Sequence, residues 1–495
     1  MAKILALDSG TTSVRAMVFD ERGRELGMCQ QEIQQAYPHT GWVEEDPMEI
    51  WDKQMRVCAQ LLKQLNMEAR EIDCIGITNQ RETLVAWDRT TGKPIYPAIV
   101  WQCRRTEAYC GQLKERGLTE WFQTKTGLIP DAYFSATKAA WVLQYVEGAR
   151  EMAARGDLLF GTIDTWLIWN ATGGKTYATD YSNASRTMLF NIQDLDWDAE
   201  ILEFFGLSRD NLPQIYESGA DYGVVRSDIL GAPIPITAVL GDQQSALFGH
   251  LCLEKSEAKC TYGTGAFILA NIGQKPIASK QGLLTTVAWG YKGRVDYAFE
   301  GSIFMAGAVV GWLRDNLGII RKASDTEAMA TSVPSSEGVY FVSTFQGLGA
   351  PWWQNGRRAS IQGMSRKTNG NHIVRAALES VAYRVRDVVG AMEREMGMPC
   401  KTLRADGGMT ANHFLMQFQS DILQIPVSTG TEAEVTALGA AYMAGLAGGV
   451  WRDAAELAGF VAEAERFYPQ ISAVAADELY DGWLEAIGIS AKEIT

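Results

Sequence analysis

The fold is decided by Asp8-Ser9-Gly10-Thr11-Thr12-Ser13, a turn that joins two apolar segments, residues 4–7 and 14–19. Gly10 carries no Cβ, so the chain can bend there and bring N–H groups and threonine hydroxyls toward an anion. A similar turn, Tyr262-Gly263-Thr264-Gly265-Ala266, lies in the second half of the chain. Each turn alone is typical of an ordinary β-hairpin, but one in each half predicts a nucleotide held between two duplicated domains.

The length of the chain also favours two domains. Its 495 residues exceed what one hydrophobic core usually supports. We expect the boundary near residue 248, which gives an N-terminal domain of residues 1–247 and a C-terminal domain of residues 248–495. Strands and helices alternate along both halves, so the predicted class is α/β.

The composition limits the classes of binding partner that we expect and indicates the cellular compartment. The formal net charge of −14 argues against nucleic acid and against an anionic membrane surface. The longest uncharged stretch, residues 435–451, is too short for a span, so we expect a buried helix and no membrane insertion. The eight cysteines are scattered without metal-ligand spacing, and no signal peptide begins the chain, which indicates reduced thiols and a cytoplasmic protein.

Two buried strands of the first half are expected to end in polar residues. Residues 72–77 lead into the polar run at 78–83, and residues 234–240 lead into Gly241-Asp242-Gln243. Because ligands bind at the carboxyl ends of parallel strands, both runs are expected to face the ligand. Asp242 is then a candidate general base, since desolvation makes its carboxylate a better acceptor of a hydroxyl proton. The alternative is that Asp242 only caps the following helix, and one side chain can do both.

Other polar residues carry similar pairs of interpretations. Asp8 can serve a phosphate-bound cation or accept turn N–H groups, and its place beside the glycine turn favours the cation. Arg81 and Glu82 form either a surface ion pair or a donor and acceptor for the hydroxyls of a small polyol. Trp101 and Phe267 can cover the carbon edge of that polyol, although Trp101 alone would be taken as a core residue.

The second half ends a predicted strand at Asp406-Gly407-Gly408, before a helix that begins near Asn412. This sequence is typical of a turn, and it also permits close approach of a nucleotide to the backbone.

Several longer segments are more specific than these turns, and through them the chain resembles the FGGY carbohydrate kinases of the actin-like ATPase superfamily, in particular those that act on glycerol. The segments are residues 77–83, 99–106, 180–190, 300–307 and 412–418. The resemblance covers nearly the whole chain. It implies two ribonuclease-H-like domains with an active-site cleft between them, and ATP-dependent phosphorylation of glycerol to sn-glycerol 3-phosphate with Mg²⁺. It also implies a homodimer or homotetramer.

The resemblance assigns site residues position by position. The residues implied for glycerol are Arg81, Glu82, Trp101, Tyr133, Asp242, Gln243 and Phe267, with Asp242 as the base. Those implied for the nucleotide are Thr11, Thr12, Ser13, Arg15, Thr264, Gly265, Gly307, Gly311, Gly408 and Asn412. Asp8 is implied to lie near the metal, through water.

The chain departs from the family at a few positions. Ser9 and Gly311 stand where the family commonly has glutamine, and Gly311 removes a side-chain donor to the nucleotide. The family's elements for allosteric inhibition and for histidine phosphorylation are not evident between residues 218 and 234. Two alternatives stay open on sequence alone: another FGGY sugar or polyol kinase, and a non-catalytic actin-like ATP-binding protein.

Overall fold

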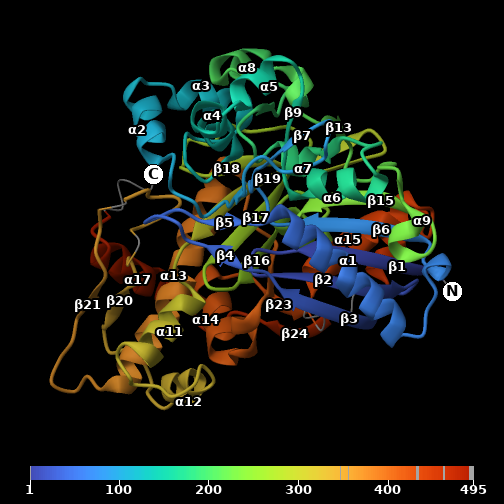
Figure 1. The fold of residues 1–495 in the computed structure, drawn as a ribbon. Helices are drawn as coiled ribbons and strands as arrows, with labels where there is room; N and C mark the ends of the chain where they lie inside the picture. Colours follow the sequence, from blue (N-terminus) through green and yellow to red (C-terminus); the bar gives the residue numbers. More distant parts are fainter. Residues whose placement is uncertain (1, 346, 355, 431–433, 461–462, 490–495) are drawn as a thin grey trace.

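The computed structural model describes residues 2–345, 347–354, 356–430, 434–460 and 463–489. In the part of the chain that it describes, each half contributes one large mixed β-sheet with helices packed around it (Figure 1). The predicted α/β class is therefore confirmed.

The first sheet has the strand order β14-β15-β6-β1-β2-β3. Its strands are β1 (Lys3–Ser9), β2 (Ser13–Asp20), β3 (Glu25–Glu32), β6 (Cys74–Asn79), β14 (Val224–Val225) and β15 (Ile234–Gly241). β1, β2 and β3 form an antiparallel meander, and β6 and β15 run parallel to β1.

The second sheet has the order β18-β19-β17-β16-β22-β23-β24. Its strands are β16 (Glu257–Tyr262), β17 (Ala266–Gly273), β18 (Leu284–Tyr291), β19 (Arg294–Ile303), β22 (Thr402–Asp406), β23 (Val427–Gly430) and β24 (Glu463–Phe467). Again an antiparallel hairpin, β16 and β17, adjoins two strands parallel to its first member, β22 and β23. The two sheets thus repeat one plan, as the paired turns predict.

Both faces of the first sheet are covered, which explains why its central strands are almost entirely apolar. Alternate residues of β1 enter different cores. Leu5 and Leu7 pack in the core that includes Val57 of α1 (Pro47–Gln64), while Ile4 and Ala6 pack in the core that includes Ala441 of α15 (Val435–Ala447).

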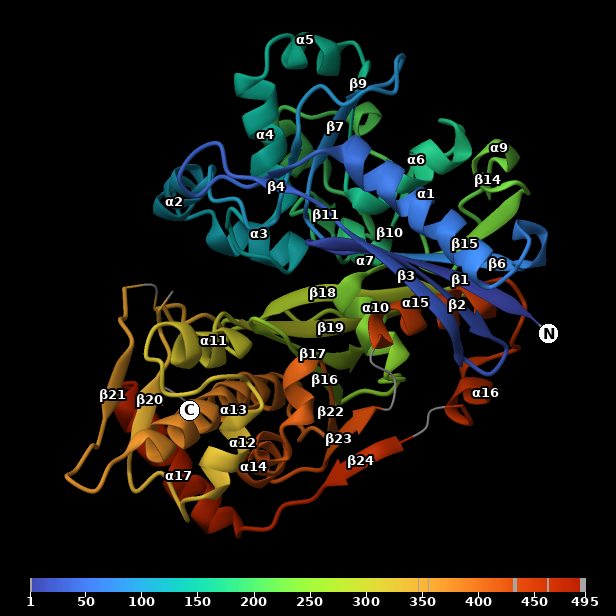
Figure 2. The ribbon, with the colours of Figure 1, turned by 60° about the horizontal axis from the view of Figure 1, so that its bottom comes forward.

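Helix α15 comes late in the chain but lies on the first sheet, against β1, β6 and β15. It also packs against α10 (Asp242–Gly249), and Figure 2 shows the two helices beside each other between the lobes. The contact is close, because a Cβ added at Gly439 would lie 1.8 Å from the backbone oxygen of Ser245. The predicted domain boundary at residue 248 falls inside α10, and its exact position stays a prediction.

The remaining elements surround these sheets. In the first half they are β4 (Gln35–Ala36), β5 (Glu44–Glu45), β7 (Val85–Asp88), β8 (Ala98–Ile99), α2 (Glu107–Glu115), α3 (Thr119–Thr126), α4 (Ser135–Tyr145), α5 (Ala149–Ala154), β9 (Leu158–Gly161), α6 (Ile163–Thr172), β10 (Ala178–Asp180), α7 (Tyr181–Ala184), β11 (Phe190–Asn191), β12 (Asp196–Trp197), α8 (Ala199–Phe205), β13 (Gln214–Tyr216) and α9 (Ser227–Leu230). In the second half they are α11 (Gly307–Asp315), α12 (Asp325–Thr331), β20 (Tyr340–Val342), β21 (Ser360–Gln362), α13 (Gly370–Met396), α14 (His413–Leu423), α16 (Ala454–Ala458) and α17 (Ala473–Ala486). Short 3₁₀ turns cover Ala69–Glu71, Arg209–Asn211 and Gly408–Ala411.

Among the described residues, none of the helices combines the length and apolar character needed to cross a bilayer. Val435–Ala447 of the uncharged stretch at residues 435–451 form the interior helix α15 instead. All eight cysteines are free thiols, in agreement with the sequence-based expectation.

The α10–α15 contact predicts a stability effect. Gly439→Ala places a methyl group against the backbone of Ser245, so we expect a loss of about 1–3 kcal/mol in the free energy of unfolding, measured by chemical denaturation. Gly111→Ala in α2 is the matched control, because no atom lies within 4 Å of its added Cβ. We expect that control to be stabilising by about 0.5–1 kcal/mol. Equal stability of the two variants would contradict the close contact.

Candidate active site

The carboxyl ends of β6 and β15 bring the two predicted polar runs together. The strands are parallel neighbours in which Gly241 lies opposite Asn79, so both runs leave the sheet at the same edge. Gly241 is the N-cap residue of α10, and Asp242 is the first helical residue. The Asp242 carboxylate accepts the N–H of Gln243 at 2.7 Å, so it assists the helix start without being the N-cap residue. Its side chain is 31% exposed and can reach a ligand.

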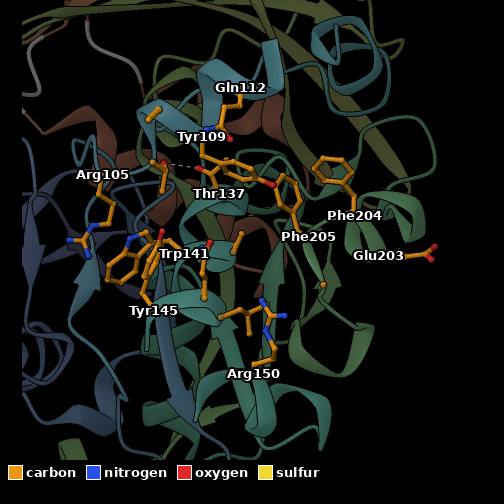
Figure 3. Close-up of a pocket in the computed structure, with 16 residues that line it drawn as sticks. Arg105, Tyr109, Gln112, Thr137, Trp141, Tyr145, Arg150, Glu203, Phe204 and Phe205 are labelled. Carbon is orange, nitrogen blue, oxygen red and sulfur yellow. Dashed lines mark hydrogen bonds between the residues drawn. The ribbon is translucent and has the colours of Figure 1, made fainter. Parts of the chain in front are cut away.

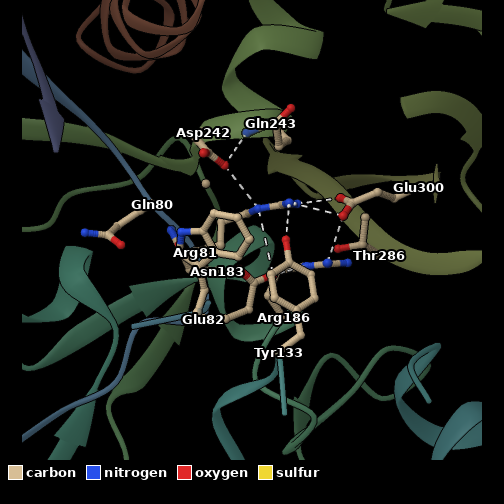
Figure 4. Close-up of polar contacts among 12 residues, drawn as sticks. Gln80, Arg81, Glu82, Tyr133, Asn183, Arg186, Asp242, Gln243, Thr286 and Glu300 are labelled. Atoms are coloured by element: carbon tan, nitrogen blue, oxygen red, sulfur yellow. Dashed lines mark hydrogen bonds and ion pairs between the residues drawn. The ribbon is translucent and has the colours of Figure 1, made fainter. Parts of the chain in front are cut away.

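A buried network of charges lies beside Asp242 (Figure 4). Arg81 donates to both carboxylate oxygens of Glu300, at 2.6 and 3.1 Å, and its Nε lies 3.1 Å from Oδ1 of Asp242. Arg186 donates to Glu82 at 2.7 Å and to Glu300 at 2.9 Å. Glu300 belongs to β19 of the second half, whereas both arginines belong to the first half.

The arginines hold Glu300 in its charged form. Burial acts to raise its pKa, but the guanidinium groups of Arg186 and Arg81 outweigh burial and lower the pKa of Glu300 to about 2. Because the carboxylate is ionised, it can satisfy both arginines at once, and the network fixes the position of Arg81.

The structure shows the partners of Arg81. A surface ion pair with its neighbour Glu82 was one of the two sequence-based interpretations, but these two side chains are 3.9 Å apart, and the shorter contacts of Arg81 go to Glu300 and Asp242. Glu82 contacts Arg186 instead. The backbone bends at these two residues, beyond the end of β6, so their side chains reach different partners.

The backbone of Glu82 is held in an unusual conformation. Its φ angle is +61°, in the left-handed region that costs energy for a residue with a Cβ. Its carbonyl accepts hydrogen bonds from the Ser135 hydroxyl at 3.0 Å and from Nζ of Lys138 at 3.1 Å. Two buried donors thus hold the peptide at the edge of the site.

Three aromatic residues lie close to one another beside the charged network. The ring of Trp101 lies 5.5 Å from that of Tyr133 and 6.4 Å from that of Phe267. The Tyr133 hydroxyl accepts from Arg81 at 3.3 Å. Trp101 is half-buried, and its indole N–H donates to Thr11 of the first turn at 3.0 Å. The arrangement therefore joins an apolar wall to the Arg81–Asp242 pair and to the first turn.

The residues of the first turn differ in their exposure to solvent. Thr12 is exposed and Thr11 is half-buried, whereas Ser13 is buried in β2. Arg15 lies 3.6 Å from Asp8 and also pairs with Glu434. Arg15 and Asp8 thus form an ion pair with each other in this site.

Asp8 lies near the end of β1, beside the end of β6. Burial raises its pKa to about 7, with Arg15 acting against the shift and the carboxylates of Glu434 and Asp242 adding to it. A second cation near Asp8 would relieve this unfavourable field.

The second turn packs tightly against the start of α11. The carbonyl of Thr264 accepts the N–H groups of Ala306 and Ala308, both at 3.0 Å, and a Cβ at Gly307 would lie 2.7 Å from the oxygen of Gly263. A Cβ at Gly265 would lie 2.4 Å from the oxygen of Ile303. These glycines are required by close backbone packing.

The other predicted nucleotide residues divide into two kinds. Gly311 and Gly408 have no atom within 4 Å of an added Cβ, so open space lies beside them. Asn412 is the N-cap of α14, where its side chain accepts from Leu415 at 2.9 Å and donates to Thr326 at 3.1 Å. Both the oxygen and the NH₂ group of the Asn412 amide thus have protein partners.

A separate cavity of about 690 Å³ lies on the first half, between α2, α4 and α8 (Figure 3). Tyr109, Trp141 and Phe205 are among its lining residues, and it shares none of them with the predicted site. No group of three or more metal-ligating side chains occurs within the described ranges.

Arg186 and Glu300 are central to the site and were missed as functional residues by sequence reasoning. Both stand in segments that carry the family resemblance, residues 180–190 and 300–307. Their pairing joins positions more than one hundred residues apart, and nothing in the local pattern indicates it.

The fold and the site together define a two-domain phosphotransferase of the α/β class. The N-terminal domain of the FGGY family of carbohydrate kinases matches residues 3–249, and the C-terminal domain of that family matches residues 258–448. The chain belongs to the FGGY family of carbohydrate kinases.

Individual relatives match over the whole length. The chain is 53% identical over 490 residues to glycerol kinase 2 of Thermotoga maritima, with 99% of each chain covered. It is 54% identical over 485 residues to glycerol kinase of Carboxydothermus hydrogenoformans, covering 98% of this chain and 97% of the relative. A crystal structure of Plasmodium falciparum glycerol kinase with ADP matches with a TM-score of 0.94 and 37% identity, covering 99% and 98% of the two chains.

The charge network predicts the effect of neutralising Glu300. In Glu300→Gln the two arginines lose a shared counter-charge in a buried site, so we expect the free energy of unfolding to fall by about 3–5 kcal/mol. Glu456→Gln removes the carboxylate from an exposed pair with Arg452 and should cost less than about 1 kcal/mol. Chemical denaturation of both variants gives the comparison. Losses of equal size would mean that Glu300 does not carry the network.

Proposed function

We propose that this chain transfers the terminal phosphoryl group of ATP to glycerol and forms sn-glycerol 3-phosphate. The observation that carries the proposal is the identity of 53–54% over the whole chain with glycerol kinases, combined with the contacts that lead from Asp242 to Arg81, from Arg81 to Tyr133 and from Tyr133 to Trp101. The gluconate and xylulose kinases of Lactobacillus acidophilus are each 20% identical and support the fold alone.

Asp242 is the group best placed to accept a proton. Its carboxylate is accessible, and Arg81 fixes its orientation at 3.1 Å. In the proposed step Asp242 takes the proton of a terminal hydroxyl of glycerol, the hydroxyl oxygen bonds to the γ-phosphorus, and the bond to the β–γ bridging oxygen breaks to release ADP. Arg81, Glu82 and Gln243 would hold the hydroxyls, while Trp101 and Phe267 cover the carbon chain.

Magnesium fits the donor set. Mg²⁺ keeps several waters and is usually bound by one or two carboxylates together with the substrate phosphates, and Asp8 offers a buried carboxylate next to Asp242. Asp8 would hold the ion through water, and the ion would neutralise charge on the phosphates. Thr11, Thr12, Thr264 and Gly265, at the two turns, would lie next to those phosphates.

The proposal extends to compartment and assembly. Eight free cysteines agree with a reducing cytoplasm. The family resemblance supports a homodimer or homotetramer, for which light scattering of the purified protein is the direct test.

Replacing the base should stop turnover. We expect Asp242→Asn to lower kcat by roughly a hundred- to ten-thousandfold, because the amide cannot accept the proton, with little change in ATP binding. A coupled assay of ADP release with ATP and glycerol measures turnover, and calorimetry measures nucleotide binding. Asp194→Asn, at an exposed position, is the matched control. Nearly unchanged turnover in Asp242→Asn would mean that Asp242 only assists the start of α10 and is not the base.

The acceptor is tested with a panel of polyols. The unmutated chain should phosphorylate glycerol in preference to pentuloses and gluconate. Activity on one of those sugars with none on glycerol would contradict the proposed substrate, and ATP hydrolysis that needs no acceptor would favour the alternative of an actin-like ATP-binding protein without phosphotransfer to a polyol.

Removing the Asp8 carboxylate should weaken the binding of Mg²⁺ on which the reaction depends. We expect Asp8→Asn to raise the Mg²⁺ concentration for half-maximal activity by about ten- to a hundredfold, the usual effect of losing an outer-sphere ligand. The titration is done at fixed ATP, and Asp52→Asn on the exposed face of α1 serves as control. An unchanged Mg²⁺ dependence would place the ion elsewhere.

A further inference from the structure

Lys259 is a buried cation next to the site that neither the sequence pattern nor the proposed mechanism uses. It lies in β16 with its side chain removed from solvent. Nζ donates to the side-chain oxygen of Gln243, and to Oγ1 of Thr261 at 2.8 Å. Both acceptors are neutral, and among the described residues Lys259 forms no ion pair within 4 Å.

A charged group without a directly paired counter-charge is costly to bury. The presence of Lys259 at this buried position therefore suggests that its ammonium has a role in the site. Burial lowers the pKa of Lys259, and the carboxylates of Asp406 and Asp242 act against that shift at longer range. The ammonium is thus held by the field of two site carboxylates and by two neutral oxygens.

The contact with Gln243 has a geometric consequence. An ammonium can only donate hydrogen bonds, whereas an amide has an accepting oxygen and a donating NH₂ group. The amide oxygen of Gln243 must therefore face Lys259. The NH₂ group then faces the other way, and among the described residues it has no hydrogen-bond partner, so it can donate to a ligand. Without Lys259 this constraint on the amide is lost.

Strand β22, the parallel neighbour of β16, holds the far end of α10. The ring of His250, just after α10, lies 2.7 Å from Asp406 of β22, and Arg404 of β22 donates to the His250 carbonyl. Lys259 and Arg404 are register partners in the parallel pair β16–β22. The second sheet thus contacts α10 at both ends: β16 at its first turn and β22 just after its last residue.

We propose that Lys259 is a positioning residue for glycerol recognition: it fixes the side-chain amide of Gln243 so that the NH₂ group donates to a substrate hydroxyl next to Asp242. The inference rests on the proposed function and deepens it. Lys259 itself does not contact the substrate in this account and acts through Gln243.

Kinetics of Lys259→Met test the inference. The methionine fills the buried space but leaves the amide free to turn over, so we expect KM for glycerol to rise roughly three- to tenfold, the worth of one hydrogen bond. The KM for ATP should stay the same and kcat should change less than KM. Lys275→Met, at an exposed position, is the matched control and should leave every parameter unchanged.

A double-mutant cycle separates positioning from general disturbance of the fold. Gln243→Ala alone should raise KM for glycerol, and adding Lys259→Met to it should raise KM little further. Effects that multiply independently, or an unchanged KM in Lys259→Met, would overturn the inference. Lys259→Gln gives a second variant if methionine impairs folding, with a smaller rise expected because the NH₂ group of glutamine can still donate to the Gln243 oxygen. Absence of glycerol phosphorylation by the unmutated chain would instead defeat the proposed function.

Discussion

The contact between Arg81 and Glu300 is the interaction on which the site depends. Four charged side chains, Arg81, Arg186, Glu82 and Glu300, are buried together, and each is tolerable only with an opposite charge at hydrogen-bond distance. The arginines come from the first half of the chain and Glu300 from the second. Their charges balance only when the halves are together, so assembly of the two halves also fixes the guanidinium that contacts Asp242.

Duplication supplies the framework around that network. Each large sheet has an antiparallel hairpin next to two parallel strands, and each carries a glycine-containing turn at the same place in its plan. Asp8, Asp242 and Asp406 all lie at or just beyond the carboxyl end of a strand. Helix α10 connects the halves, since it packs on α15, which covers the first sheet, and is held at both ends by strands of the second.

Much of the site could be anticipated from residues at strand ends. Asp242 and Arg81 follow neighbouring parallel strands, so their proximity follows from strand order alone. Trp101 and Phe267 lie together as the resemblance implies, although their roles in binding stay predictions. Lys259 could not be found in this way, because a lysine at one of the alternating polar positions of β16 gives no indication of the side chain that it contacts.

The sequence by itself determined the α/β class, the duplicated plan with its paired turns and the membership in a kinase family. These depend on local patterns: apolar periodicity, glycine at sharp turns and polar residues where strands end. Only the tertiary structure decided which charges pair. Arg81 forms its short ion pair with Glu300 and not with its neighbour Glu82, and Glu82 pairs with Arg186. Such pairing is set by which side chains are buried together at the junction of the two halves, and distance along the chain carries no information about it.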